Sequence, residues 1–232
     1  MLAVRSYGRP ARTAANLSVG PSCSDIFFPV AGPFTTYVDD QVLDQCANMK
    51  VELLATGPDS VKEIAGGYLQ FNVAVGVAAG FVIHTPGIAG AFSVKHDFII
   101  NPGTGAFFTP GFTQNPAPAT SADYDFFVEC SESLGTVTCQ FYFPMNGYAQ
   151  PVPASGTFPA GNLGRLILTK IDANNYKVEL FDLTAGGPAI ATATFTDVDM
   201  NIVPGTEYNV TGVIVGYGST TPVLLNRLQG LV

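Results

Sequence analysis

GRLILTKIDANNYKVELFDL, from Gly164 to Leu183, is the stretch that decides the fold. Two runs rich in β-branched and aromatic residues flank Asp172-Ala173-Asn174-Asn175, and that composition is typical of a tight turn. The apolar residues recur with a period near two, whereas an amphipathic helix needs a period of 3.6. The stretch therefore predicts a β-hairpin.

The hairpin is expected to have one apolar face and one polar face. With Asp172 to Asn175 as the loop, the facing pairs on the apolar side are Ile171 with Tyr176, Thr169 with Val178, and Ile167 with Leu180. The other side carries Lys170, Lys177 and Glu179, and it makes the two lysines direct neighbours across the strands. We expect the apolar face to pack and the charged face to meet water.

The composition indicates one all-β domain. Of 232 residues, 47% are hydrophobic and only 12% are charged, against about 25% in ordinary soluble proteins. Glycine and proline break the apolar residues into short bursts, and no window approaches the ~18 apolar residues of a membrane helix. So few charges favour a subunit whose surface is covered by neighbouring copies.

Further extended segments are expected along the whole chain. In the run Ala91 to Ile100, one face should carry Phe92, Val94, His96 and Phe98. Two segments lack a regular period and contain many prolines, so residues 101–122 and 144–162 are predicted as long loops. The first of these loops carries the phenylalanines that we expect to form an interface: Phe107, Phe108 and Phe112.

The first 24 residues are charged differently from the rest. They hold Arg5, Arg9 and Arg12 without any acidic residue, which gives +3, whereas the remaining seven basic and 18 acidic residues give −11. We expect residues 1–33 to be an arm with a first extended segment, and residues 34–232 to be a single domain. A basic arm of this kind can dock on an acidic partner. A frayed terminus is the alternative, and nucleic-acid binding is not expected.

The four cysteines form no CxxC pair or zinc-like cluster. Cys130 and Cys139 become direct cross-strand partners if the turn between them lies on Leu134-Gly135, but not if it is centred on Ser133. Residues 1–24 contain no continuous apolar core of a signal peptide, so we expect synthesis in a cytoplasm. Free buried thiols are the expected state in that compartment.

The order of segments resembles the concanavalin A-like (laminin-G-like) jelly-roll sandwich over residues 36–220. The residues that carry the resemblance are Tyr68-Leu69, Phe92-Ser93-Val94, Arg165-Leu166-Ile167-Leu168 and Tyr176-Lys177-Val178-Glu179-Leu180. The resemblance implies an all-β fold in which two antiparallel sheets pack face to face. It does not by itself imply a function.

Glycan hydrolysis is not expected. Retaining hydrolases of this family carry two glutamates on one strand, about 5 Å apart. The nearest match here, Asp123 to Glu132, has the wrong order and spacing, because Glu129 and Glu132 lie on opposite faces of a strand. His84 and His96 lack a neighbouring nucleophile, so no catalytic residue and no triad is predicted.

Sugar binding without catalysis is an alternative. The chain has no Trp, and Tyr148, Tyr217 or the loop phenylalanines could serve as the aromatic platform. No cofactor is expected, although alternating oxygens at Asp197, Asp199 and Asn201 make a weak candidate for calcium. An ordinary solvated acidic loop is the preferred interpretation of that segment.

The leading hypothesis is a non-enzymatic structural subunit of a virus particle, such as a phage capsid, decoration or head/tail accessory protein. The basic arm, the low charge and the aromatic loop favour it. Its partners would be copies of itself or another virion protein, assembled in the host cytoplasm. The alternatives are a carbohydrate-binding adhesion module, acting outside the cell, and a cell-surface filament subunit.

Overall fold

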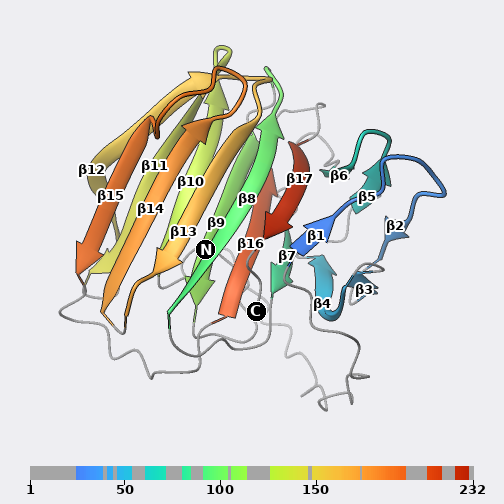
Figure 1. Ribbon diagram of the computed structural model, residues 1–232, viewed down its shortest axis with the longest axis horizontal. Coiled ribbons are helices and arrows are strands. Elements are labelled where there is room, and N and C mark those ends of the chain that lie inside the picture. The colour runs from blue at the N-terminus through green and yellow to red at the C-terminus, as the bar shows by residue number, and fades with distance from the viewer. Residues whose placement is uncertain are drawn as a thin grey trace, which may run out of the picture.

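Alternating burial along the chain produces two antiparallel sheets that face each other as layers of a sandwich (Figure 1). The computed structural model describes residues 25–38, 41–43, 46–53, 61–71, 80–84, 91–103, 106–113, 126–145, 148–172, 174–196, 208–215 and 223–229. The elements found in these ranges are all β-strands. No described helix has the length and apolar character needed to cross a bilayer.

The first sheet, sheet 1, contains the Gly164–Leu183 hairpin. Its described strands follow the order β15-β14-β13-β8-β17-β6-β5-β2, and β1 also pairs with β17. The bounds are β1 Asp25–Phe27, β2 Thr36–Tyr37, β5 Val61–Ile64, β6 Tyr68–Phe71, β8 Phe92–Ile100, β13 Gly164–Lys170, β14 Asn175–Asp182, β15 Ala191–Thr196 and β17 Val223–Gln229.

In the second sheet, sheet 2, strands β12, β11, β10 and β9 lie behind β15, β14, β13 and β8 in Figure 1. Its described strands follow the order β12-β11-β10-β9-β16-β7-β4-β3. The bounds are β3 Gln41–Leu43, β4 Cys46–Leu53, β7 Gly80–His84, β9 Ala106–Thr113, β10 Phe126–Ser133, β11 Thr136–Met145, β12 Tyr148–Pro159 and β16 Tyr208–Val215.

Aromatic rings from both sheets meet in the core. Phe98 of sheet 1 lies 4.6 Å from Phe108 of sheet 2, measured between ring centroids, and Phe92 lies 4.8 Å from Phe112. Burial of such rings contributes several kcal/mol each, so this layer holds the two sheets together. The core also contains Leu69, Val94, Ile100, Phe126, Val128, Val137, Phe141, Phe158, Leu166, Leu168, Tyr176, Val178, Leu180 and Phe195.

The expected two-faced strand from Ala91 to Ile100 is confirmed as β8. Phe92, Val94, His96 and Phe98 are buried on the core side, while Ser93 and Lys95 are half-exposed on the other. Side chains of a strand alternate between its two faces, so a sequence with apolar residues at every second position predicts which face is buried.

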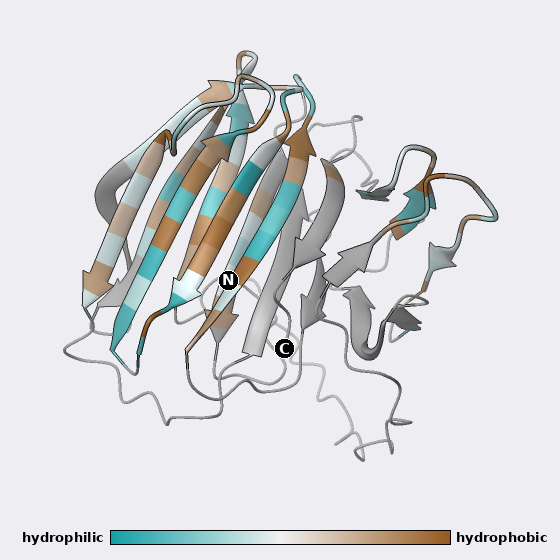
Figure 2. Cartoon of the chain, in the orientation of Figure 1, coloured by the Kyte–Doolittle hydropathy of each residue, from teal (hydrophilic) through white to brown (hydrophobic). Residues whose placement is uncertain are grey.

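The Gly164–Leu183 hairpin is confirmed, but its predicted register is wrong by one residue. Lys170 pairs with Tyr176, and Leu168 pairs with Val178. Because a shift of one residue exchanges the two faces of a strand, β13 turns Leu166 and Leu168 into the core. The residues predicted to face the core on β14 are correct, and Figure 2 shows hydrophilic and hydrophobic bands alternating along that strand.

The loop chemistry explains the shift. The carboxylate of Asp172 accepts hydrogen bonds from the backbone N–H of Asn174 and of Asn175, each 2.9 Å long, and the backbone N–H of Ile171 donates to the carbonyl of Asn175. The strand therefore ends at Lys170, so Ile167 lies half-buried on the outer face and Ile171 is exposed. Lys170 is buried and is not opposite Lys177, which pairs with Thr169.

The two predicted long loops contain strands. Residues 101–122 include β9, and residues 144–162 include β12. Strand β9 lies between β10 and β16, with Pro110 opposite Thr211, and β12 forms one edge of sheet 2. Phe108 and Phe112 are fully buried between the sheets, so the expectation that they form an exposed interface is wrong.

Candidate functional site

The strands β10 and β11 form a hairpin whose core side and outer side carry different kinds of side chains. Its turn is Leu134-Gly135, where both residues have positive φ, 52° and 80°, and the side chain of Glu132 accepts the N–H of Gly135. The resulting register pairs Phe127 with Tyr142 and Glu129 with Gln140. Side chains of these two pairs share the face that points away from the core.

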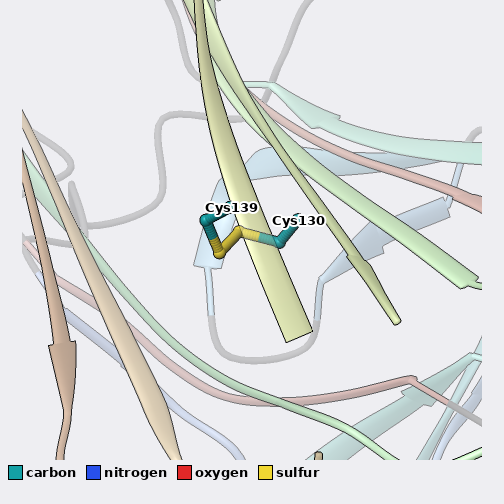
Figure 3. Close-up of a disulfide and its surroundings, with 2 residues drawn as sticks. All are labelled: Cys130 and Cys139. Atoms are coloured by element: carbon teal, nitrogen blue, oxygen red, sulfur yellow. A yellow bond between two sulfur atoms is a disulfide. The ribbon is translucent and has the colours of Figure 1, made fainter. Parts of the chain in front are cut away.

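The core side of this hairpin carries a disulfide. Cys130 lies directly opposite Cys139, and their sulfur atoms are 2.07 Å apart (Figure 3). Both cysteines are fully buried, so the expectation of free thiols at these two positions is wrong. The Leu134-Gly135 turn that the sequence left as one of two options is the turn that brings them together. Disulfides of this type persist in oxidising environments.

On the outer side, Tyr142 stacks on Phe127. The ring centroids are 4.8 Å apart, and the planes differ by 7°. Phe127 is nearly fully buried although it faces away from the core, whereas Tyr142 is half-exposed. The neighbouring Gly111 permits this arrangement, because a Cβ there would lie 2.8 Å from the Cβ of Phe127 and 2.5 Å from the carbonyl oxygen of Phe126. The stack fixes the orientation of the exposed tyrosine ring.

The next cross-strand pair on the same side is Glu129 with Gln140. Both are half-exposed, and burial raises the pKa of the Glu129 carboxyl above its ordinary value. Burial, followed by the nearby charge of Glu129, also raises the pKa of Tyr142. A carboxylate partly withdrawn from water and close to an aromatic ring is the kind of group that functional sites contain. We call Phe127, Glu129, Gln140 and Tyr142 the β10–β11 outer face.

The surroundings of this face are rich in hydroxyl groups. Ser131 pairs with Thr138 beyond Glu129, and β12 places Ser155 opposite Gln140 and Thr157 opposite Thr138. Ser155 and Thr157 are exposed, whereas Thr109 on β9 is buried. At these positions the outer side is therefore exposed on β12 and covered on β9.

The outer face of sheet 1 is different. Arg165 makes a bidentate ion pair with Asp97, with nitrogen–oxygen distances of 2.6 and 2.7 Å. Hydrogen bonding to Asp97 raises the pKa of Arg165. Lys177 lies 2.8 Å from Glu179 along β14. On this face, each of these two cations is paired with a carboxylate on a neighbouring residue. Such ion pairs are typical of a face that stabilises the fold and binds no ligand.

The carboxylate pair of a retaining glycosidase is not assembled on β10. Glu129 points outward, whereas Glu132 is buried toward the core and its Oε1 accepts the N–H of Gly135 at 2.8 Å. This agrees with the expectation that the two glutamates lie on opposite faces. A second carboxylate close to Glu129 is what a two-carboxylate mechanism would need.

The structure places few of the predicted site residues. Tyr148 begins β12, opposite Met145, and Phe107 lies on β9, opposite Ile214. The remaining predictions fall outside the described residues, namely the arm arginines Arg5, Arg9 and Arg12, the platform candidate Tyr217, and the calcium candidates Asp197, Asp199 and Asn201. Within the described ranges, no group of three or more His, Cys, Asp or Glu side chains could hold a metal ion.

His96 is a core residue. It is fully buried, and its ring lies edge-on to Phe108 with 6.0 Å between the ring centroids. Burial lowers its pKa to about 3, so the imidazole is neutral at physiological pH. The expectation that His96 shares one face of its strand with Phe92, Val94 and Phe98 is confirmed, and His96 takes no part in the site.

Sequence reasoning missed Gln140, Tyr142 and Phe127. The signal was present, because a turn on Leu134-Gly135 sets Phe127 opposite Tyr142 in the same way that it sets Cys130 opposite Cys139. From the sequence we considered the cysteine pair, which lies on the inner face of the hairpin. We did not consider Phe127, Gln140 and Tyr142 on the outer face.

Comparison with known proteins identifies the fold. No family model and no curated protein matches the chain. Among solved structures, a protein of unknown function from Shewanella oneidensis MR-1 has a TM-score of 0.57 at 11% identity, covering 91% of this chain and 88% of that one. The carbohydrate recognition domain of Emp47p has a TM-score of 0.53 at 11% identity, covering 80% and 89%.

The exoplasmic/lumenal domain of VIP36, in a form bound to calcium and mannose, has a TM-score of 0.52 at 8% identity, covering 78% of this chain and 81% of that one. At such low identity these likenesses concern the fold alone. The chain has the concanavalin A-like jelly-roll fold, as the sequence resemblance implied.

Proposed function

We propose that this protein is a non-catalytic carbohydrate-binding module and that it binds glycans on the β10–β11 outer face. One observation carries the proposal: the half-exposed ring of Tyr142 is held flat on Phe127, one cross-strand pair away from Glu129 and Gln140. An aromatic platform beside a few convergent polar groups is the usual make-up of a small-ligand site.

Each group has a defined role in this proposal. The face of the Tyr142 ring offers an apolar surface to the C–H groups of a sugar ring. The carboxylate of Glu129 accepts hydrogen bonds from sugar hydroxyls, while the amide of Gln140 both donates and accepts them. Because Glu132 lies on the core side, Glu129 has no second carboxylate on its strand with which to hydrolyse the ligand.

Two further points favour this function over a virion subunit. Structures with the same fold include a carbohydrate recognition domain and a mannose-bound lumenal domain. The aromatic residues that favoured assembly, Phe108 and Phe112, are buried within one chain. The virion role of the arm, in residues 1–24, stays a prediction. The buried disulfide supports action outside a reducing cytoplasm, at the cell surface or beyond it.

The test is a glycan array followed by titration of the strongest ligand. Tyr142→Ala should weaken binding at least about tenfold, a loss of about 1.4 kcal/mol, because it removes the platform. Tyr68→Ala is the matched control, since Tyr68 is a half-exposed tyrosine on β6 of sheet 1. Its affinity should equal that of the unchanged protein.

Two results would contradict the proposal. The first is an array on which the folded protein binds no glycan. The second is a glycan affinity that Tyr142→Ala and Gln140→Ala leave unchanged, which would place the site elsewhere. Addition of a calcium chelator in parallel tests whether the candidate at Asp197, Asp199 and Asn201 contributes.

A further inference from the structure

The strands that carry the proposed site contain no basic residue. Between Lys95 and Arg165 the sequence has neither lysine nor arginine, and β9, β10, β11 and β12 all lie within that interval. The basic residues on the described strands of sheet 1 are Lys62, Lys95, Arg165, Lys170, Lys177 and Arg227. On sheet 2, Lys50 lies on β4, which β9, β16 and β7 separate from β10. Sheet 2 therefore presents Glu129 without a described cation beside it.

The hydrogen-bonding groups of the β10–β11 outer face match hydroxyls rather than anions. The ionised carboxylate of Glu129 only accepts, the phenol of Tyr142 donates or accepts, and Gln140 does both. Burial and the charge of Glu129 raise the pKa of Tyr142, so its hydroxyl keeps its proton at neutral pH. Ser131 and Thr138 add hydroxyls on the same side. A ligand carboxylate or sulfate needs cationic donors, and this face offers none among the described residues.

We propose that the β10–β11 outer face selects glycans without acidic groups and rejects those that carry carboxylate, sulfate or phosphate. This inference rests on the proposed function and adds a substrate class to it. The selectivity comes from Glu129, because a second negative charge close to this half-buried carboxylate is repelled more strongly than it would be in open water. Gln140 and Tyr142 then bind the uncharged hydroxyls.

Matched glycans test the inference directly. Neutral N-acetyllactosamine oligosaccharides and their sialylated and sulfated forms are presented at equal density to the unchanged protein and to Glu129→Gln. The unchanged protein should bind the neutral form at least about tenfold more tightly than either acidic form. Glu129→Gln preserves the shape of the side chain and removes its charge, so it should bring the acidic and neutral forms within about threefold of each other.

A second variant separates the charge effect from a general loss of binding. Glu179→Gln removes a half-exposed carboxylate from the outer face of sheet 1 and should leave the neutral-to-acidic ratio unchanged. Added salt should reduce the ratio of the unchanged protein, because ions screen the repulsion at a partly exposed group.

The outcomes are distinguishable. Equal or tighter binding of the sialylated or sulfated glycans by the unchanged protein overturns this inference and leaves the proposed function standing. A preference for neutral glycans that survives in Glu129→Gln also overturns it, since the selectivity would not come from this carboxylate. Failure to bind any glycan overturns both.

Discussion

The two outer faces of the sandwich handle their charged side chains in opposite ways. On sheet 1, Asp97 is buried and its carboxylate accepts hydrogen bonds from Nε and Nη2 of Arg165, and Lys177 makes an ion pair with Glu179. On sheet 2, Glu129 is also partly buried, yet the strands around it contain no lysine or arginine. Buried and solvent-facing side chains alternate along the strands of both sheets. This alternation alone does not explain why the carboxylates of one face have cationic partners and Glu129 has none on its neighbouring strands.

A carboxylate that is partly buried without a cation costs free energy, and its raised pKa is the sign of that cost. Natural sequences tend to accept such costs at functional positions. We therefore assign a structural role to the ion-paired carboxylates of sheet 1, and the proposed function assigns a binding role to Glu129. Each of the following predictions tests one side of this contrast.

Arg165→Ala should have the largest effect on stability. It leaves Asp97, with 5% of its side chain exposed, without its partner, so we expect a loss of about 3 kcal/mol in the free energy of unfolding. Urea denaturation measures it. The double variant Arg165→Met/Asp97→Leu should regain most of the loss. If Arg165→Ala unfolds at the same urea concentration as the unchanged protein, the pair is not structural.

Removal of the disulfide should lower the free energy of unfolding by somewhat less than Arg165→Ala does. Cys130→Ala/Cys139→Ala frees a loop closed across nine residues of sequence separation, and loops of this length correspond to about 2–3 kcal/mol. Thermal unfolding with and without reductant is the measurement. Reductant should lower the midpoint of the unchanged protein toward that of the double variant. Because the disulfide lies behind Glu129 and Gln140, glycan affinity should fall as well.

Acid should destabilise the fold through His96. Its pKa is about 3 in the folded protein and 6.5 when the chain is unfolded, so the unfolded chain binds a proton that the folded protein excludes between these values. The part of the folding stability that depends on neutral His96 is fully present above pH 6.5, and it is lost as the pH falls toward 3. Between pH 7 and pH 5 the loss from this group reaches up to about 2 kcal/mol.

The comparison of His96→Leu with the unchanged protein isolates that contribution. The difference in urea midpoint between pH 7 and pH 5 should be smaller in the variant. An identical pH dependence in both proteins would show that other groups carry the acid sensitivity. Glu129 does not act in the same direction, because a raised carboxyl pKa makes the folded form easier to protonate as the pH falls.

Lys177→Ala should have the smallest effect. The side chains of Lys177 and Glu179 are 35% and 24% exposed, and such surface pairs contribute about 0.5 kcal/mol or less. Differential scanning calorimetry at low and high salt measures it, and high salt should remove the difference. A loss as large as that of Arg165→Ala would mean that the two pairs of sheet 1 act as one network.

Much of the fold could be predicted from the sequence where side chains alternate. Strand β8 was predicted with the correct faces because Phe92, Val94 and Phe98 recur every second residue among polar ones. Strand β13 was assigned the wrong face because Leu166-Ile167-Leu168 is apolar at every position, so alternation cannot choose between its sides. Asp172 made the choice through its hydrogen bonds to the loop backbone.

Strands β9 and β12 were missed for a different reason. Proline removes a backbone donor and is normally kept out of central strands, yet Pro110 lies within β9, between β10 and β16. Strand β12 also contains prolines, which an edge strand tolerates. The site was missed because its pairing depends on the β10–β11 turn, and the sequence allowed two positions for that turn. In the structure the turn lies on Leu134-Gly135, where both residues have positive φ and the Glu132 side chain accepts the N–H of Gly135.

The position of β17 determines which parts of the protein can form first during synthesis. This strand, from Val223 to Gln229, lies in the middle of sheet 1, where β8 pairs with one edge and β6 and β1 pair with the other. The β10–β11 hairpin closes between neighbouring residues and can form as soon as its own residues are made. Sheet 1 cannot be completed until a ribosome has released Val223 to Gln229, because long-range pairings must wait for both partners. During synthesis, therefore, the strand pair that carries the proposed site precedes the completed sheet 1.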